Sequence, residues 1–322
     1  MRKSGRRIES GGEDTLVLKN FDELMALAKT HNRPKTVAVP AAGDLHVLEA
    51  VVLARREGLV EPLLIGSRTI ITELLAQLGE RVAEGQIFDI TDVHQAAQRA
   101  VDLVKEGRVD FLMKGQLNTA DLLRAILNRK DGLPHGKVVT NLTILELPWY
   151  HKLLAVNDGA IIPYSTLEQK EAQIRACVQA LHTLGYGNNL KVAVICANEE
   201  ISPKIIETVE AAELKRINQA GEMGGCVVEG PISLDLALSI QAAKRKGYQS
   251  PVAGDADFLL FPNLISANVF NKQAEFSGAT PVGVLLGASV PVAISSRSAT
   301  AKSKLGSLAL AALASTVSLE GG

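Results

Sequence analysis

The residues best suited to chemistry lie near the end of the chain, where the apolar segment 291–294 runs into "SSRSAT" (295–300). Hydroxyl groups there surround Arg297 at a predicted strand-to-helix junction. The planar guanidinium suits a phosphate or a developing oxyanion, and Ser296 adds a hydroxyl beside it. The first N–H groups of the following helix would point at the same spot. The junction predicts an anion site, with a serine-rich helix cap beside a packed arginine as the plainer alternative.

A second junction of this design follows "VDFLM" (109–113). Lys114 and Gly115 end this predicted strand, and Thr119 can cap the next helix. A lysine, a hydroxyl and exposed N–H groups at a helix start can bind an anion, although an ordinary loop with a solvated lysine has the same pattern. Arg124, five residues further on, either faces the same direction or lies on the surface. Two such junctions in one chain indicate a substrate rich in phosphate.

Polar residues also follow two other predicted strands. Asn157, Asp158 and Gly159 come directly after "KLLAV", and Asn268 lies in the segment after "DADFLLF". Ligands of an open parallel sheet bind beyond the carboxyl ends of its strands. We therefore expect these residues to lie near the same site.

The elements that must position these residues alternate along most of the chain. Short Val- and Ile-rich segments, typical of buried strands, are separated by amphipathic helices, a rhythm that predicts a parallel sheet with right-handed crossovers. The rhythm changes near 137–165, where two predicted strands follow each other without a helix between them. This change indicates a local antiparallel element or a domain boundary.

Composition narrows the function classes. The chain has 322 residues, 47% of them apolar, and a net charge of −1, so no overall field favours nucleic acid or anionic lipid. We expect neither a nucleic-acid nor a membrane partner, because no apolar run is long enough to span a bilayer. Residues 1–14 read as a short disordered lead rather than a signal peptide. The three cysteines are far apart in the sequence, so we expect buried thiols in a reducing cytoplasm.

Motifs for several other activities are missing. The sequence has no Walker A loop, no HExxH and no GxSxG, and "GYGNNL" (185–190) precedes a predicted strand instead of a helix. An NAD-dependent or ATP-hydrolysing role therefore has little local support. No metal site is predicted, since the histidines and cysteines do not cluster.

Four segments resemble the phosphate acetyltransferase/phosphate butyryltransferase family, the butyryl side more closely. They are "MKGQLNTADLLRAILNRKDGL" (113–133), "PKIIETVEAAELKRI" (203–217), "EGPISLDLALS…AGDADFLLFPN" (229–263) and "ISSRSATAKSKLGSLALAAL" (294–313). The resemblance runs from about residue 36 to the C-terminus. It implies reversible transfer of a short acyl group: acyl-CoA plus inorganic phosphate gives acyl phosphate plus CoA. CoA is then a substrate or product, and no cofactor is needed.

The resemblance also implies an architecture. The family has a two-domain α/β parallel-sheet (Rossmann-like) fold similar to that of isocitrate and isopropylmalate dehydrogenases. Residues 1–140 plus 290–322 would form the first domain and residues 141–289 the second, with the active site in the cleft between them. The family further suggests a homodimer.

The family's Ser-Arg pair falls on Ser296 and Arg297, where the serine holds the CoA sulfur and the arginine stabilises the transition state. An aspartate that is the proposed base in the acetyl enzymes corresponds here to Ser303. Asp158 is then our first candidate for the base and Asp255 the second. Lysines and a helix N-terminus that lower the pKa of the CoA thiol are the alternative. The predicted substrate-binding residues are Lys114, Gly115, Thr119, Arg124, Asn268 and Ser303.

Two other functions stay open at this point. One is an acyl-ACP phosphate acyltransferase. The other is a catalytically weak CoA- or acyl-phosphate-binding relative, which the serine at position 303 suggests.

Overall fold

The computed structural model describes residues 17–30, 33–296 and 299–316. Its first part alternates helices and strands, as the hydrophobic pattern predicts, and aspartates cap two of the helices: Asp44 accepts a hydrogen bond from the Val47 N–H, and Asp92 accepts one from the Gln95 N–H. The elements are α1 (Phe21–Ala28), β1 (Lys35–Pro40), α2 (Leu45–Arg56), β2 (Val60–Gly66), α3 (Arg68–Gln77), the 3-10 turn η1 (Glu84–Gln86), β3 (Ile87–Asp89), α4 (Val93–Lys105), β4 (Phe111–Met113) and α5 (Thr119–Ile126).

The second part begins with a long strand and ends with a buried helix. Its elements are β5 (His135–Glu146), β6 (Leu154–Val156), α6 (Leu167–Thr183), β7 (Leu190–Ile195), α7 (Ile206–Gln219), β8 (Cys226–Ile232), α8 (Leu234–Leu238), α9 (Ile240–Lys246), β9 (Phe258–Leu260), α10 (Leu264–Phe276), β10 (Thr280–Ala288), β11 (Val292–Ile294) and α11 (Ala301–Ala314).

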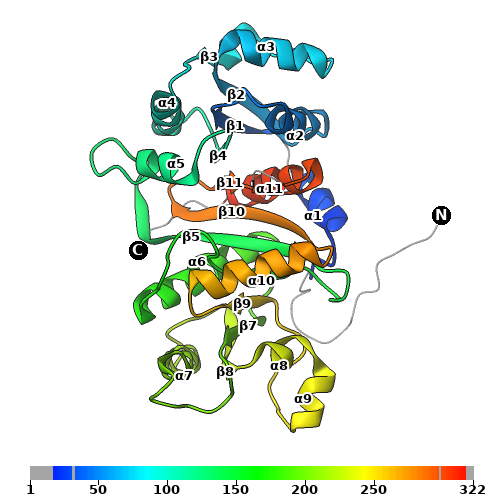
Figure 1. The fold of residues 1–322 in the computed structure, drawn as a ribbon, viewed down its shortest axis with the longest axis vertical. Helices are drawn as coiled ribbons and strands as arrows, with labels where there is room; N and C mark the ends of the chain where they lie inside the picture. The colour runs from blue at the N-terminus through cyan, green and yellow to red at the C-terminus, as the bar shows by residue number, and fades with distance from the viewer. Residues whose placement is uncertain (1–16, 31–32, 297–298, 317–322) are drawn as a thin grey trace, which may run out of the picture.

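These strands form one sheet in the order β3-β2-β1-β4-β11-β10-β5-β6-β9-β7-β8 (Figure 1). Neighbours are parallel except around the centre, where β10 is antiparallel to β5 and β11, and β5 is antiparallel to β6. The antiparallel element expected near residues 137–165 is therefore confirmed. The sheet runs through both parts of the chain, so the division into domains at about residues 140 and 290 stays a prediction.

The pair β5–β10 forms the centre of the sheet. Its register runs from Thr280 opposite Glu146 to Ala288 opposite His135, with a bulge near the end. Gly287 occupies the bulge with a φ of +94°, and a Cβ at this position would lie 2.0 Å from the Val138 carbonyl oxygen. Only glycine fits a backbone approach this close, so the bulge depends on this residue.

The last helix, α11, belongs to the first part of the sheet. It contacts α1, α2 and β10, and nearly all of its residues from Ser303 onward are buried (Figure 1). A Cβ at Gly306 would lie 2.5 Å from a methyl group of Val282 on β10, so the missing side chain lets the helix approach the sheet closely. No helix of the described residues is long and apolar enough to cross a membrane.

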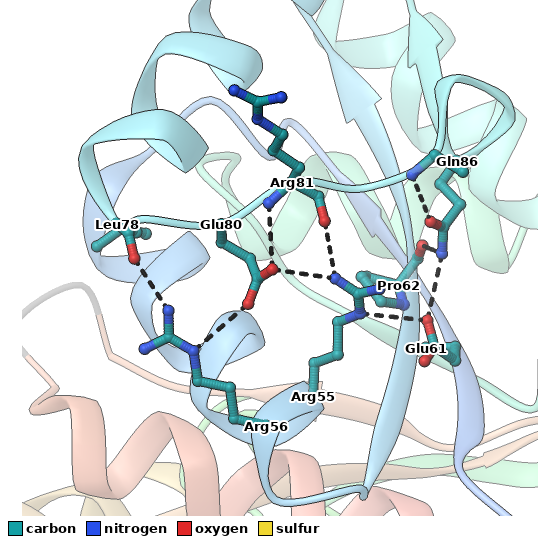
Figure 2. Close-up of polar contacts among 9 residues, drawn as sticks. Arg55, Arg56, Glu61, Pro62, Leu78, Glu80, Arg81 and Gln86 are labelled. Carbon is teal, nitrogen blue, oxygen red and sulfur yellow. Dashed lines mark hydrogen bonds and ion pairs between the residues drawn. The ribbon is translucent and has the colours of Figure 1, made fainter.

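A cluster of arginines fastens the end of α3 to α2 (Figure 2). The Arg55 guanidinium donates to the Arg81 carbonyl oxygen at 2.8 Å, and that of Arg56 donates to the Leu78 carbonyl oxygen at 3.0 Å. Both arginines also pair with Glu80 at 3.4 Å. The Arg81 N–H and these two cations hold the pKa of Glu80 below its usual value. These arginines therefore hold the segment after α3 against α2.

A buried ion cluster holds the amino ends of β6, β7 and β9. The Lys152 ammonium donates to an Asp257 carboxylate oxygen at 2.6 Å and lies 2.9 Å from an Asp255 carboxylate oxygen. Asp255 also pairs with His151 and Lys191. Burial opposes ionisation of Asp255, but the hydrogen bonds from Lys191 and Lys152 outweigh it and hold its pKa well below the usual range. Lys152 and Asp257 are almost fully buried, so each needs the other's charge.

We predict that Lys152→Met lowers the free energy of unfolding by about 3–5 kcal/mol at neutral pH, because it leaves the Asp257 carboxylate buried and unpaired. The depressed pKa of Asp255 means that its ion pairs stabilise the fold above about pH 4 and that this stabilisation is lost as the pH falls further. The effect of the substitution should therefore shrink in acid. Urea unfolding at several pH values measures both.

Arg216→Met is the control, because Arg216 pairs with Glu213 on the surface of α7. It should change the free energy of unfolding by less than about 0.5 kcal/mol. Equal losses in the two variants would contradict the role given to the buried cluster.

Candidate functional site

A cavity of about 270 Å³ opens at the centre of the sheet. Its walls are the start of α5, the middle of β5, the loop after β6, α10, the start of β10, the end of β11 with the two serines after it, and the first turn of α11. β4, β6, β9 and β11 all direct their carboxyl ends to this region. The cavity therefore lies where ligands of an open α/β sheet bind.

Four of the predicted site residues line this cavity. They come from three helices and one strand end that are far apart in the sequence: Thr119, Asn268, Ser296 and Ser303. Ser296 is exposed at the end of β11. Arg297 lies outside the described residues. Residues that follow the carboxyl ends of different strands therefore meet at one site: a threonine, an asparagine and two serines.

The first turn of α11 forms one wall. Thr300 caps the helix by accepting a hydrogen bond from the Ser303 N–H at 3.2 Å. The Ser303 hydroxyl donates to the Pro281 carbonyl oxygen, and the Lys304 ammonium donates to the Ala299 carbonyl oxygen. Ser303 therefore ties the first turn of α11 to β10, and Lys304 ties it to the residue before the helix cap. The Ser303 hydroxyl is already engaged with the backbone.

The helix α10 forms the opposite wall. Asn263 caps it by accepting from the Ser266 N–H at 3.0 Å, and Asn268 in the next turn donates to the Gly159 carbonyl oxygen at 2.9 Å. A Cβ at Gly159 would lie 3.1 Å from the Asn271 amide nitrogen and 3.2 Å from the Asn268 nitrogen. The loop after β6 therefore lies directly on α10, and Asn268 holds it there.

Asp158 organises that same loop. Its buried carboxylate accepts hydrogen bonds from the N–H groups of Ala160, Ile161 and Ile162 at 3.1, 2.7 and 3.0 Å. Burial raises the pKa of Asp158, and these three hydrogen bonds oppose the rise. The carboxylate positions Gly159 and Ala160, which line the cavity, but is not itself part of the lining. Its role as a base stays a prediction.

Lys114 and Gly115 begin the loop between β4 and α5. The Lys114 ammonium donates to the carbonyl oxygens of Gly115 at 3.3 Å and Leu117 at 3.2 Å. A Cβ at Gly115 would stand 2.2 Å from the Pro40 carbonyl oxygen, so the loop after β4 touches the end of β1. Within the described residues, neither belongs to the cavity lining. The two residues shape the loop that leads to α5.

The N-cap of α5 is not the residue that the sequence predicts. Asn118, with an extended backbone, is the N-cap, and Thr119 is the first helical residue, so the prediction that Thr119 caps the helix is wrong. Arg124 pairs with Asp121 at 2.9 Å, and its side chain is 67% exposed. Of the two options for Arg124, the structure shows the surface position.

Asp255, our second candidate for the base, does not lie at the cavity, so the prediction of its position is wrong. It lies before β9, among the lysines and histidine at the amino ends of the strands, whereas the cavity lies at the carboxyl ends. The error arises because Asp255 and the cavity residue Asn268 flank the same short strand. The short strand β9 therefore lies between Asp255, at the amino ends of the strands, and the cavity, at their carboxyl ends.

Five polar residues of the lining were missed: Asn141, Thr143, Asn271, Lys272 and Glu275. Asn141 and Thr143 alternate with Leu142 and Ile144 along β5, so they face one side of an otherwise apolar strand. A polar pair at i and i+2 in the middle of such a strand is the signal that could have found them. Lys272 and Glu275 form an ion pair at 2.8 Å on α10.

Metal ligands and disulfides play no visible part in the described structure. Across residues 17–30, 33–296 and 299–316, no group of three or more His, Cys, Asp or Glu side chains could hold a metal ion. The three cysteines are free and buried, as predicted. Burial raises the pKa of the Cys196 and Cys226 thiols to about 11, so both are protonated at neutral pH.

Comparisons with known proteins show the family of this chain. The family model "Phosphate acetyl/butaryl transferase" matches residues 90–312. The phosphate butyryltransferase of Clostridium acetobutylicum is 38% identical over 298 residues, covering 92% of this chain and 98% of its own. The phosphate acetyltransferase of Thermotoga maritima is 39% identical over 294 residues, covering 91% and 99%.

A solved structure is similar as well. The branched-chain phosphotransacylase of Enterococcus faecalis superposes with a TM-score of 0.75 at 28% identity, over 87% of this chain and 99% of its own. Since a family model covers more than half of the sequence and two relatives exceed 30% identity over nine-tenths of it, the chain belongs to the phosphate acetyl/butyryltransferase family.

Proposed function

We propose that this enzyme transfers a short acyl group between CoA and inorganic phosphate: acyl-CoA plus phosphate gives acyl phosphate plus CoA, reversibly. Family membership supports the reaction class. The structural observation that carries the proposal is the cavity where Ser296 meets the first turn of α11. There a hydroxyl and the positive end of a 14-residue helix meet at one cavity.

The reaction needs stabilisation of negative charge more than it needs a cofactor. A phosphate oxygen attacks the thioester carbonyl, an oxyanion develops, and the C–S bond breaks to release thiolate. The N-terminal N–H groups of α11 and the Ser296 hydroxyl support this charge, and we assign the same role to Arg297. The proton of hydrogen phosphate ends on the CoA sulfur, so the reaction balances without another reactant.

A short acyl group fits the size of the site. About 270 Å³ leaves room for phosphate and a few carbons beside apolar lining residues such as Val282 and Ile294. An assay of free thiol with phosphate and a panel of acyl-CoAs from acetyl to octanoyl tests both the reaction and the chain length. No thiol release with CoA substrates would favour an acyl-ACP substrate or a binding role.

We propose that the two halves, residues 1–140 with 290–322 and residues 141–289, act as domains that enclose the cavity, as in isocitrate and isopropylmalate dehydrogenases. The position of β11 and α11 beside β4 and α2 supports this grouping. We place the enzyme in the cytoplasm, because the proposed acyl-CoA substrates and the three free thiols suit a reducing compartment.

The first kinetic prediction concerns Arg297. Arg297→Ala should lower turnover by about two to three orders of magnitude, the usual loss when an oxyanion donor is removed. Arg297→Lys should restore only part of it, because an ammonium does not reproduce the planar fork. Steady-state assays of both, with the surface variant Arg216→Ala as control, measure the effect. Turnover of Arg297→Ala at the level of the unmodified enzyme would remove this residue from the mechanism.

The second concerns Ser303 and the base. The Ser303 hydroxyl donates to the Pro281 carbonyl oxygen, so Ser303→Ala should cost about 1 kcal/mol of stability and change turnover only a few-fold. If positive charge and the helix N-terminus activate the CoA thiol, activity in the CoA-consuming direction should climb from neutral to alkaline pH in both enzymes. A severe kinetic defect in a stably folded Ser303→Ala enzyme would contradict this account.

We also propose a homodimer that forms through α10. Ile265, Val269 and Phe276 lie four and seven residues apart, on one face of the helix, and are 57%, 62% and 91% exposed. Ile265 and Phe276 lie near the two ends of the helix, so an antiparallel copy would set each Phe276 against the other Ile265. Phe276→Glu should produce a monomer in sedimentation experiments, whereas Ile206→Glu on α7 should not. A dimer in both variants would exclude this interface.

A further inference from the structure

Two side-chain amides in the cavity leave an oxygen without a partner. The Oδ1 atoms of Asn141 and Asn271 are buried, yet neither accepts a hydrogen bond from any residue that the structure describes. Both residues line the cavity, Asn141 from β5 and Asn271 from α10. A buried acceptor without a donor costs about 1–3 kcal/mol, so such groups are retained where a ligand supplies the missing proton.

Asn141 is held in one orientation. The residue is only 4% exposed, and its amide nitrogen donates to the Thr143 hydroxyl at 2.9 Å. Thr143 is also buried and also lines the cavity. With the amide nitrogen on Thr143, the carbonyl oxygen is the atom left to meet a ligand.

The neighbouring strand keeps space open in front of this oxygen. Gly283 on β10 pairs with Thr143, and a Cβ there would lie 3.6 Å from the Asn141 Oδ1 and 2.9 Å from the Ile294 carbonyl oxygen. A side chain at this position would fill the space between Asn141 and the end of β11. Its absence leaves Asn141 open toward the segment that carries Ser296.

We propose that the Asn141 oxygen binds the proton of hydrogen phosphate and thereby selects phosphate over sulfate. An acceptor needs a donor, and hydrogen phosphate is the reactant anion that carries its own O–H group. Sulfate has the same shape and the same double negative charge at neutral pH but no proton to donate. This inference rests on the proposed acyl transfer to phosphate.

The hydrogen bond also orients the nucleophile. When the P–OH group points at Asn141, an unprotonated oxygen is left to attack the thioester carbonyl. The new O–C bond forms and the C–S bond breaks while the proton is held at Asn141, and the proton then passes to the thiolate. Asn141 is in this sense a positioning residue, because it acts on the phosphate through its proton.

The test compares phosphate with sulfate in Asn141→Ala. Loss of one hydrogen bond to a charged ligand should raise the KM for phosphate about ten- to a hundredfold. The inhibition constant of sulfate, measured by competition against phosphate, should change less than about threefold, and the KM for acyl-CoA should change as little. Selectivity for phosphate over sulfate should therefore fall at least tenfold. An equal weakening of both anions, or an unchanged KM for phosphate, would overturn the inference.

Two further variants distinguish a specific loss of phosphate selectivity from a general effect of removing a buried asparagine. Asn271→Ala removes the other unpartnered oxygen of the lining, and it should lower the selectivity less than Asn141→Ala does, because hydrogen phosphate carries a single proton. Asn198→Ala is the matched control, since Asn198 also has a buried oxygen without a partner in the described structure but lies outside the cavity lining. It should leave the selectivity unchanged; a loss equal to that of Asn141→Ala would also overturn the inference. An unmodified enzyme that releases no thiol would instead count against the proposed function itself.

Discussion

The antiparallel pairing of β5 with β10 is the interaction on which the rest of the structure depends. The chain passes from one side of the sheet to the other along β5 and returns along β10. Their ladder, from Thr280 to Ala288, joins two parallel arrays into one sheet. The same two strands carry Asn141, Thr143 and Gly283, so the β5–β10 pair also forms part of the cavity lining. Binding and architecture therefore rest on one set of backbone hydrogen bonds.

Most polar side chains near the cavity stabilise the backbone around it. Asp158 binds three N–H groups, Lys114 binds two carbonyl oxygens, and Asn268 ties a loop to α10. These contacts hold loops that carry no regular structure of their own. The chemistry is then left to helix N–H groups, a few hydroxyls and the two amides, which suits a reaction in which charge moves between oxygen and sulfur.

Local patterns in the sequence predict much of this arrangement. The alternation of apolar strands and helices, the break near residues 137–165 and the strand-end positions of Thr119, Asn268 and Ser296 all follow from periodicity. Asn141 was missed because most of its neighbours on β5 are apolar and buried, although Thr143 two residues further on marks a polar side of the strand. Asp158 and Lys114 carry the right charges for a site, but only the folded backbone reveals which N–H and carbonyl groups they satisfy.

The position of the last strand has a consequence for synthesis on the ribosome. β11 lies between β4 and β10, where the Leu112 and Lys114 N–H groups donate to the carbonyl oxygens of Pro291 and Ala293, and α11 covers the same part of the sheet. The N-terminal half therefore has an open strand edge and an uncovered apolar face until residue 314 has left the exit tunnel. A nascent chain that stalls before that point lacks the strand and the helix that complete the N-terminal part of the sheet.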